Sequence, residues 1–407
     1  MRASASERPG ERGPVKLSVK DLDLEGRRVF LRADLNVPLA EGRITDDTRI
    51  RSSLPTINYC LAAGASVVLA SHLGRPKGAP DARYSLAPVA GKLDGLLGRP
   101  APLAPDCVSD ATLLQALALN PGELLLLENL RFHPGEEEND REFARALGRL
   151  ADCYVNDAFS ASHRAHASLV GITRFLQPAA AGLQLQQEVE ALGRILDRPD
   201  RPLAAILGGA KVGDKLVLVR NLLMRADILL IGGGMAFTFL KAQGRAVGRS
   251  LVEDGLLEKA SELLALARER GVVLELPEDV VVAESPDGEA KGVTPAGEIP
   301  AGLMGLDIGP ASLARFREAL TAARTIVWNG PMGVFEKGAF AAGTVELARA
   351  VAASSAFSVV GGGDTAAAIH QARVEGRIGY LSTAGGAFLE FLEGRSLPGI
   401  AALTDRG

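Results

Sequence analysis

Polar side chains able to bind an anion recur in the first half of the sequence, each shortly after a short apolar run. They are Arg32, Asp34, Asn36, Arg49, His72, Arg75, Arg131, His163, Arg164 and His166. A guanidinium group can bind a phosphate or a carboxylate through two parallel hydrogen bonds. Several such groups at one sheet edge would form a site for a small, multiply charged anion. A single surface arginine is more often only solvated, so the interpretation depends on their recurrence.

Glycines occupy the corresponding turns of the second half, with few charges among them. They are Gly208, Gly209, Gly232–Gly234, Gly361–Gly363, Gly385 and Gly386. Without a Cβ atom, backbone N–H groups can approach a phosphate or a flat base closely, so this half is expected to bind a nucleotide. Lys211 stands in one such turn, where its ammonium could follow a migrating phosphoryl group or simply be solvated. Asp364 could cap the following helix or ligate Mg²⁺.

Complete fingerprints of several other enzyme classes are absent from the sequence. It contains no G-x-x-x-x-G-K-[ST] phosphate loop, no G-x-S-x-G elbow and no H-E-x-x-H. Two incomplete dinucleotide fingerprints end in Phe237 and Ala366 where a glycine is required. A nicotinamide-dependent dehydrogenase therefore stays open as an alternative on architecture alone. A non-catalytic protein that binds a phosphorylated metabolite is a second alternative.

Short apolar runs alternate with longer amphipathic segments along the whole chain, and these elements must position the polar turns. The pattern predicts an α/β fold with two Rossmann-like domains, each a parallel sheet with helices on both faces. In such sheets ligands bind beyond the carboxyl ends of the strands, where both sets of turns fall. The predicted strands are Arg28–Ala33, Ala65–Ala70, Glu123–Leu127, Asp152–Asn156, Leu203–Leu207, Asp227–Ile231, Val272–Leu276, Thr325–Trp328, Phe357–Val360 and Ile378–Leu381.

The boundary between the halves is predicted at FLQPAAAG, Phe175–Gly182, because this stretch is rich in turn-forming residues and precedes the helix Leu183–Leu196. We expect a first domain over residues 1–183, a hinge helix over 184–198 and a second domain over 199–388.

The two ends of the chain are treated separately. The tail 389–407 is too short to form a domain, so it must pack on one that is already built. Residues 1–14 lack an apolar signal-peptide core, so they are expected to form a flexible extension.

Composition excludes several partners. The 407 residues carry a net charge of -4 at a pI near 5.9, so no general basic field attracts nucleic acid or an anionic membrane. No apolar run approaches the ~18 residues of a membrane span. Cys60, Cys107 and Cys153 are widely spaced, and we expect reduced, buried thiols. A soluble cytoplasmic protein follows from these observations.

Nine motifs, in order and at similar spacing, resemble those of the phosphoglycerate kinase family. That family moves a phosphoryl group between 1,3-bisphosphoglycerate and ADP, giving 3-phosphoglycerate and ATP. The similarity runs from about Val15 to the C-terminus. The motifs are RADLNVP (Arg32–Pro38), TRIR (Thr48–Arg51), SHLGRP (Ser71–Pro76), LENLRF (Leu127–Phe132), HRAHAS (His163–Ser168), GGAKVGDK (Gly208–Lys215), IGGGMAFTF (Ile231–Phe239), VWNGPMGVFE (Val327–Glu336) and GGGDT (Gly361–Thr365).

For the first half, the resemblance implies a site for 3-phosphoglycerate or 1,3-bisphosphoglycerate. Asp34 and Asn36 would contact the hydroxyl and carboxylate end of the glycerate. The family's basic patch maps onto Arg49, His72, Arg75, Arg131 and Arg164. The resemblance also implies that the tail 389–407 returns to the first domain.

For the second half, the resemblance implies a site for Mg-ATP or Mg-ADP, with Lys211 and Lys215 near the phosphates and Glu336 on the ribose. The base pocket maps onto Gly208, Gly209, Ala210, Gly232, Gly233, Gly234 and Gly309. The remaining nucleotide-binding positions are Asn329, Gly362, Gly363, Asp364 and Thr365. Asp364 would be the residue nearest Mg²⁺, and the protein is expected to be a monomer.

Three positions depart from the family's usual pattern. Ala384 replaces a glycine in STAGGA, where it is expected to re-aim a backbone N–H. Ser160 stands where family members commonly carry glycine, and Gly213 stands where they carry serine or alanine.

The chemistry that these residues suggest needs no general base. The phosphoryl acceptor is a carboxylate, which is ionised near neutral pH because its pKa is about 4. Catalysis then consists of positioning and charge neutralisation. We hypothesise that Arg49 and Lys211 are the catalytic cations. Because the two substrates bind different domains, a hinge must close before transfer can occur.

Overall fold

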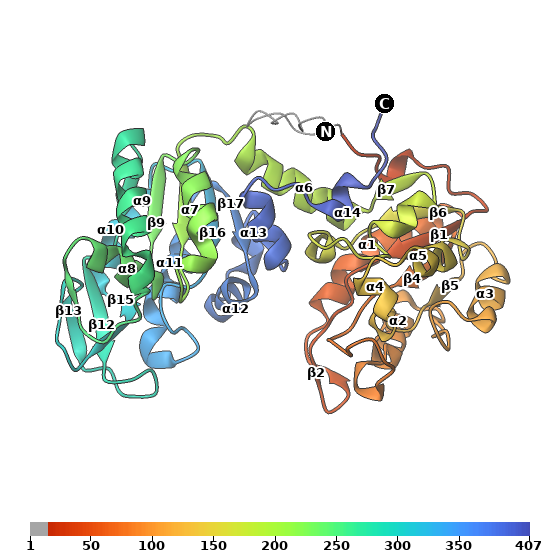
Figure 1. The fold of residues 1–407 in the computed structure, drawn as a ribbon, viewed down its shortest axis with the longest axis horizontal. Helices are drawn as coiled ribbons and strands as arrows, with labels where there is room; N and C mark the ends of the chain where they lie inside the picture. Colours follow the sequence, from red (N-terminus) through yellow and green to blue (C-terminus); the bar gives the residue numbers. More distant parts are fainter. Residues whose placement is uncertain (1–14) are drawn as a thin grey trace. The chain divides into compact units, whose positions relative to one another are not determined.

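The chain packs into two compact units (Figure 1). In a computed structural model that describes residues 15–407, the first unit ends at Glu190 and includes the tail Ser396–Gly407, and the second spans Ala191–Arg395. The division falls inside helix α6 (Leu183–Leu196), whereas the sequence suggested that the whole helix lies between the domains. The expectation for residues 1–14 lies outside the described residues.

The first unit is built on a parallel sheet of five strands in the order β5-β4-β1-β6-β7. The strands are β1 (Arg28–Arg32), β4 (Ser66–Ala70), β5 (Leu124–Leu126), β6 (Cys153–Asn156) and β7 (Ala179–Ala181). Adjacent residues of β1 point to opposite faces, and both Phe30 and Leu31 are fully buried, so helices and loops cover both faces.

Strand β7 lies inside the predicted boundary stretch Phe175–Gly182. It pairs with β6 through Tyr154 and Ala179, so these residues belong to the first sheet, within the residues 1–183 expected for the first domain. Three alanines carry little strand propensity, and only the sheet edge that they complete makes them a strand. The helices and short strands around this sheet are β2 (Leu39–Ala40), β3 (Arg43–Ile44), α1 (Thr48–Ala62), α2 (Ala87–Leu97), α3 (Asp110–Leu117), α4 (Pro134–Glu137), α5 (Arg141–Gly148) and α14 (Pro398–Ala401).

The second unit contains a parallel sheet of six strands in the order β11-β9-β8-β16-β17-β18. The strands are β8 (Leu203–Leu207), β9 (Ile228–Ile231), β11 (Val273–Glu275), β16 (Thr325–Asn329), β17 (Phe357–Gly361) and β18 (Tyr380–Ser382). The helices are α7 (Leu216–Leu223), α8 (Met235–Ala242), α9 (Leu257–Arg270), α10 (Pro310–Leu320), α11 (Ala342–Ala353), α12 (Gly363–Ala372) and α13 (Gly386–Leu392). The predicted α/β class, with parallel sheets and flanking helices in both units, is confirmed.

A three-stranded antiparallel sheet in the second unit was not predicted. Its strands are β12 (Asp279–Ala283), β13 (Gly292–Pro295) and β15 (Met304–Ile308), and a further short pair joins β10 (Ala246–Val247) to β14 (Glu298–Ile299). An alternation of strands and helices does not predict this sheet, because no helix separates β12 from β13.

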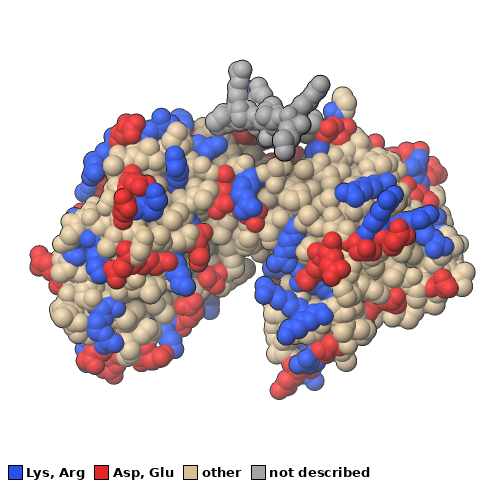
Figure 2. All heavy atoms as spheres, viewed as in Figure 1, with Lys and Arg blue, Asp and Glu red and all other residues tan. Residues whose placement is uncertain are grey.

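The remaining composition-based expectations can be compared with the described residues. All three cysteines are free and buried, as predicted. Among residues 15–407, no helix has the length and hydrophobicity needed to span a membrane. Figure 2 shows basic and acidic side chains interspersed over most of the visible face of the described residues, with a run of basic side chains along one edge of the first unit.

Candidate active site

The turn after β1 is linked by hydrogen bonds to three neighbouring segments. The Asp34 carboxylate accepts from Arg49 Nη1 at 2.7 Å and from the backbone N–H of Asn36 at 3.1 Å. The Ser160 hydroxyl donates to the same carboxylate oxygen that receives Arg49. Asn36 in turn accepts from the N–H of Gly74 at 2.9 Å, which ties this turn to the one after β4. The structure therefore brings Asp34, Asn36 and Arg49 together.

Behind this turn lies Arg32, which the sequence placed among the anion-binding side chains but which is fully buried. Arg32 is 1% exposed, and its guanidinium donates to Ser168 Oγ at 3.0 Å and lies 3.1 Å from His72 Nδ1. Burial first, and then the positive charges of Arg32 and Arg131, hold the pKa of His72 well below its usual value. His72 is therefore neutral at physiological pH and contributes no cation to the basic patch.

Two further predicted arginines are held by backbone or imidazole acceptors. Arg131 is buried, and its Nη1 donates to the carbonyl of Gly74 at 2.8 Å while its Nε lies 3.1 Å from a carboxylate oxygen of Glu137. Burial lowers the pKa of Arg131 to about 10, so it stays charged at neutral pH. Arg164 Nε donates to His163 Nε2 at 3.2 Å.

Arg75 completes the set, which we call the first-unit rim: Asp34, Asn36, Arg49, His72, Arg75, Arg131 and Arg164. Arg75 is exposed, and its side chain makes no hydrogen bond or ion pair within residues 15–407. The pKa of buried His166 is affected by the same arginines. Burial, and then Arg131 and Arg32, lower its pKa to about 3. The rim is therefore strongly positive, as an anion site requires.

In the second unit, a hollow of about 390 Å³ lies at the carboxyl ends of β8, β16 and β17. We call it the glycine hollow. The predicted residues that line it are Gly209, Ala210, Lys211, Lys215, Asn329, Gly362, Gly363, Asp364 and Thr365. Asp214, Gly330, Pro331, Gly385 and Leu389 also line it and were not assigned to the site from the sequence. Strand-end position alone indicated Gly385, but no charge or spacing distinguished the others.

Backbone geometry explains two of the glycines. Gly362 has a φ of +100°, and a Cβ there would lie 2.7 Å from Asn329 Nδ2. A Cβ on Gly208 would lie 2.0 Å from the carbonyl oxygen of Pro331. Gly362 is also the N-cap of α12, and no side chain caps this helix, so its first N–H groups remain available to a ligand. Asp364 therefore does not act as the cap.

Lys215 and Lys211 differ in their environments. Lys215 Nζ donates to the carbonyl of Gly208 at 2.6 Å and to that of Asn329 at 3.3 Å. Burial lowers its pKa to about 8, although the charges of Asp364 and Asp214 oppose the shift. Lys211 is exposed and has no side-chain hydrogen bond or ion pair within the described chain. Lys215 thus holds β8 to β16, while Lys211 is available to a ligand.

Asn329 and Thr365 are likewise engaged within the protein. Asn329 Nδ2 donates to the carbonyl of Gly361 at 2.7 Å, and the N–H of Gly330 donates to Thr365 Oγ1 at 2.7 Å. Both side chains connect the turn after β16 to the turn after β17. They fix the shape of the glycine hollow through these bonds.

The other predicted nucleotide residues lie outside the glycine hollow: Gly208, Gly232, Gly233, Gly234, Gly309 and Glu336. A Cβ on Gly233 would lie 2.6 Å from the Gly209 nitrogen, so Gly233 allows these turns to pack. A Cβ on Gly309 would lie 2.3 Å from Asp279 Cγ, so Gly309 likewise allows close packing against Asp279. Glu336 is exposed. For these residues, contact with base or ribose stays a prediction.

The residues of the glycine hollow are suitable for magnesium. Mg²⁺ prefers one or two carboxylates together with substrate phosphates, and the carboxylates of Asp364 and Asp214 line this hollow. Asp106, Cys107 and His133 form a separate group of metal-ligating types in the first unit. His133 Nε2 already lies 2.6 Å from Asp106 Oδ1, and the Cys107 thiol donates to the carbonyl of Glu128, so we assign no metal there.

The three departures from the family pattern have local explanations. Ala384 adopts a backbone outside the left-handed region, and its N–H donates to Ser382 Oγ at 3.2 Å. The N–H of Gly213 donates to a carboxylate oxygen of Glu253 at 3.0 Å. Ser160 contacts Asp34, so it is part of the rim's hydrogen-bond network.

Comparisons with known proteins agree with this arrangement. The phosphoglycerate kinase family model matches residues 19–395. The chain is 56% identical over 393 residues to the phosphoglycerate kinase of Moorella thermoacetica, covering 96% of this chain and 100% of that protein. It is 53% identical over 394 residues to the phosphoglycerate kinase of Synechococcus elongatus, covering 95% of this chain and 98% of that one.

Solved structures give the same answer. The structure of phosphoglycerate kinase from Coxiella burnetii superposes with a TM-score of 0.88 at 45% identity, covering 95% of this chain and 98% of that one. Phosphoglycerate kinase from Pyrococcus horikoshii superposes with a TM-score of 0.83 at 37% identity over the same shares of the two chains. The chain that carries this charged rim and this glycine hollow belongs to the phosphoglycerate kinase family and is a phosphotransferase with a carboxyl group as acceptor.

Proposed function

We propose that the first-unit rim binds 3-phosphoglycerate or 1,3-bisphosphoglycerate and that the glycine hollow binds the phosphates of Mg-ATP or Mg-ADP. The observation that carries this assignment is the contrast in donors. The rim presents guanidinium groups, whose charges add to burial in lowering the pKa of His166 to about 3, whereas the hollow presents backbone N–H groups and one unpaired ammonium within the described residues. The first suits a small polyanion, and the second suits a phosphate chain.

The roles within the rim follow from its hydrogen bonds. Asp34 and Asn36 are the only non-basic members, and they sit in one turn, so they would contact the glycerate hydroxyl and carboxylate end. Arg131 and Arg164 would bind the phosphate ester. Arg49 lies on the first turn of α1, and its side chain is 29% exposed. It can therefore reach a phosphoryl group while its paired Asp34 contacts the glycerate.

Lys211 is the residue of the second unit that we assign to the transferring phosphoryl group, since its ammonium is exposed and lines the glycine hollow. Asp364, with Asp214 beside it, would hold Mg²⁺. When bound, the magnesium ion would neutralise charge on the nucleotide phosphates. The free N–H groups at the start of α12 would donate hydrogen bonds to the same phosphates.

No side chain of the rim is needed as a base. The acceptor carboxylate is already ionised, and its oxygen attacks phosphorus in line with the leaving ADP oxygen. His72 and His166 are poor proton acceptors, because burial and the surrounding arginines lower both pKa values. Loss of either imidazole should therefore leave no kinetic signature of a lost base in the pH profile.

Transfer requires the two bound substrates to meet, so we infer that the units close on each other once both ligands are present. Closure would also exclude water that hydrolyses the acyl phosphate. Small-angle scattering should show compaction with 3-phosphoglycerate and a non-hydrolysable Mg-ATP analogue together, and less with either alone. Unchanged scattering in the ternary complex would contradict closure.

Activity itself is tested by ADP release from MgATP in the presence of 3-phosphoglycerate. Turnover that requires both substrates supports the assignment. Binding of both without turnover would indicate a metabolite-binding protein, and binding of NAD in place of ADP would indicate a dehydrogenase. We further infer a cytoplasmic monomer without nucleic-acid or membrane partners, and light scattering coupled to size exclusion tests the monomer.

A further inference from the structure

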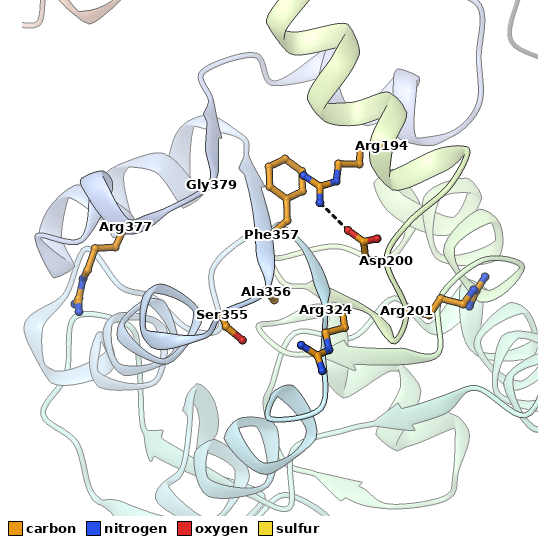
Figure 3. Close-up of a pocket in the computed structure, with 9 residues that line it drawn as sticks. All are labelled: Arg194, Asp200, Arg201, Arg324, Ser355, Ala356, Phe357, Arg377 and Gly379. Atoms are coloured by element: carbon orange, nitrogen blue, oxygen red, sulfur yellow. Dashed lines mark hydrogen bonds and ion pairs between the residues drawn. The ribbon is translucent and has the colours of Figure 1, made fainter.

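A second hollow in the second unit does not belong to the transfer chemistry. It has a volume of about 670 Å³ and is lined by Arg194, Asp200, Arg201, Arg324, Ser355, Ala356, Phe357, Arg377 and Gly379. We call it the arginine hollow (Figure 3). Its residues stand at the amino ends of β8, β16, β17 and β18. The glycine hollow lies at the carboxyl ends of the same sheet, and a strand of five residues spans about 16 Å, so the two hollows lie at opposite ends of the strands.

Four arginines and one aspartate line this hollow, and their partners differ. Arg194 lies over the ring of Phe357, with its guanidinium carbon 4.2 Å from the ring centroid, and pairs with Asp200 at 2.6 Å. Arg201 extends away from the other three in Figure 3, and it pairs with Asp227 at 2.6 Å, which is outside the lining.

Arg324 and Arg377 have no such partner. Neither side chain forms a hydrogen bond or an ion pair within residues 15–407, although both line the same concavity. Arg324 precedes β16 and Arg377 precedes β18, so they come from different turns. Two like charges without a counter-charge raise the local positive potential, and a concave surface concentrates it. Surface arginines elsewhere in this unit, such as Arg315 and Arg317, have carboxylate partners.

We propose that the arginine hollow is a second anion site, which binds a small molecule carrying two or more phosphoryl groups. Arg324 and Arg377 would each pair with a different phosphoryl group, because each guanidinium binds phosphate through two hydrogen bonds. The volume is within the range of small-molecule sites, and the lining offers little apolar surface beyond the Phe357 ring, which Arg194 already covers. An apolar ligand is therefore disfavoured.

Calorimetry with inorganic tripolyphosphate tests the proposal. The full chain is first saturated with Mg-ADP and 3-phosphoglycerate, so that the catalytic anion sites are occupied. One residual tripolyphosphate site is expected. Its affinity should fall at least tenfold in the Arg324→Ala/Arg377→Ala double variant, because two charge-assisted contacts are lost. ADP affinity should not change, since both residues are exposed and lie outside the catalytic site.

The matched control is Arg268→Ala/Arg270→Ala, which removes the same charge from the same unit at the exposed end of α9. This variant should keep the residual site unchanged. Absence of a residual site in the parent protein, or equal affinity in all three proteins, would overturn the proposal. Inorganic phosphate is expected to bind at least tenfold more weakly than tripolyphosphate. Equal affinity for the two would overturn the assignment to a ligand with several phosphoryl groups.

Discussion

The two units differ in the groups that they offer for binding an anion. The first-unit rim uses long charged side chains whose heads are held by one another, as Arg49 is held by Asp34 at 2.7 Å. The glycine hollow uses backbone, with turns so close that a Cβ on Gly208 would lie 2.0 Å from a neighbouring carbonyl. A side-chain site tolerates backbone change and depends on charge, whereas a backbone site depends on the absence of a side chain.

The largest effect should come from removing the one cation that each unit contributes to the reacting phosphoryl group. We expect Arg49→Ala and Lys211→Ala each to lower kcat by about 10²–10³-fold, the scale of a single lost transition-state donor. Steady-state kinetics in both directions measures it. The control for Arg49 is Arg51→Ala, two residues further along α1 and paired with Asp47. The control for Lys211 is Lys259→Ala, paired with Glu262. Near-normal kcat in a folded Arg49 or Lys211 variant would refute its assignment.

The second prediction applies to the backbone site alone. Gly362→Ala should weaken ADP binding at least tenfold, because φ +100° disfavours alanine and the new methyl would press on Asn329. Affinity for 3-phosphoglycerate should be unchanged. Gly376→Ala is the control, since Gly376 lies outside the glycine hollow and nothing lies within 4 Å of an added Cβ there. Calorimetric titration of each variant with both ligands makes the comparison. If Gly362→Ala kept the ADP affinity of the parent protein, ADP binding would not depend on the backbone conformation of this turn.

The same difference explains what the sequence could predict. Charged residues after apolar strands predicted a rim because their side chains are of types that bind anions. Arg49 and Asp34 do form an ion pair there. Gly309 carries no such signal. It was grouped with the base-binding glycines, yet it packs against Asp279 outside the glycine hollow. A glycine required for packing and one required for a ligand look identical in sequence.

The elements themselves show a similar limit. Strands with β-branched or leucine-rich cores, such as β4 and β8, matched their predicted bounds within a residue. The alanine strand β7 and the antiparallel β12–β15 sheet did not stand out, because tertiary pairing rather than propensity makes them strands. The state of His72 was equally hidden, since its neutrality comes from burial beside Arg32.

Each unit also buries a carboxyl that the reaction does not use, and this pair predicts a pH effect. Burial raises the pKa of Asp157 and of Asp307 to about 7. Between about pH 4 and 7 the folded state then binds more protons than the unfolded state, so the free energy of unfolding falls as pH rises through this range. The slope is roughly 1 kcal/mol per pH unit for each group. Thermal melts at several pH values should show this fall.

Asp157→Asn should flatten part of that slope, because an amide oxygen can still accept from the N–H groups of Gln184 and Leu185. The control is Asp152→Asn. There, although partial burial opposes it, hydrogen bonds from Arg28 lower the pKa. Its contribution to stability is present above pH 4 and lost as pH falls below it, so the slope between pH 5 and 8 should not change. Parallel melting curves for Asp157→Asn and the parent would contradict the prediction.

The smallest effect tests how far the rim depends on its own side-chain network. Ser160 donates to the Asp34 oxygen that also receives Arg49, so its hydroxyl competes with Arg49 for one acceptor while it fixes the carboxylate. Ser160→Ala should raise KM for 3-phosphoglycerate about two- to fivefold with little change in kcat, because the lost hydrogen bond is made within the protein and not to the substrate. ADP affinity, which depends on the other unit's backbone, should stay constant. The control is Ser53→Ala on α1, the helix that carries Arg49. It removes a hydroxyl that donates to the Arg49 carbonyl at 3.1 Å. If Ser160→Ala changes kcat more than KM, the hydroxyl acts through Arg49 on the transfer step, and the rim then couples binding to catalysis through a single carboxylate oxygen.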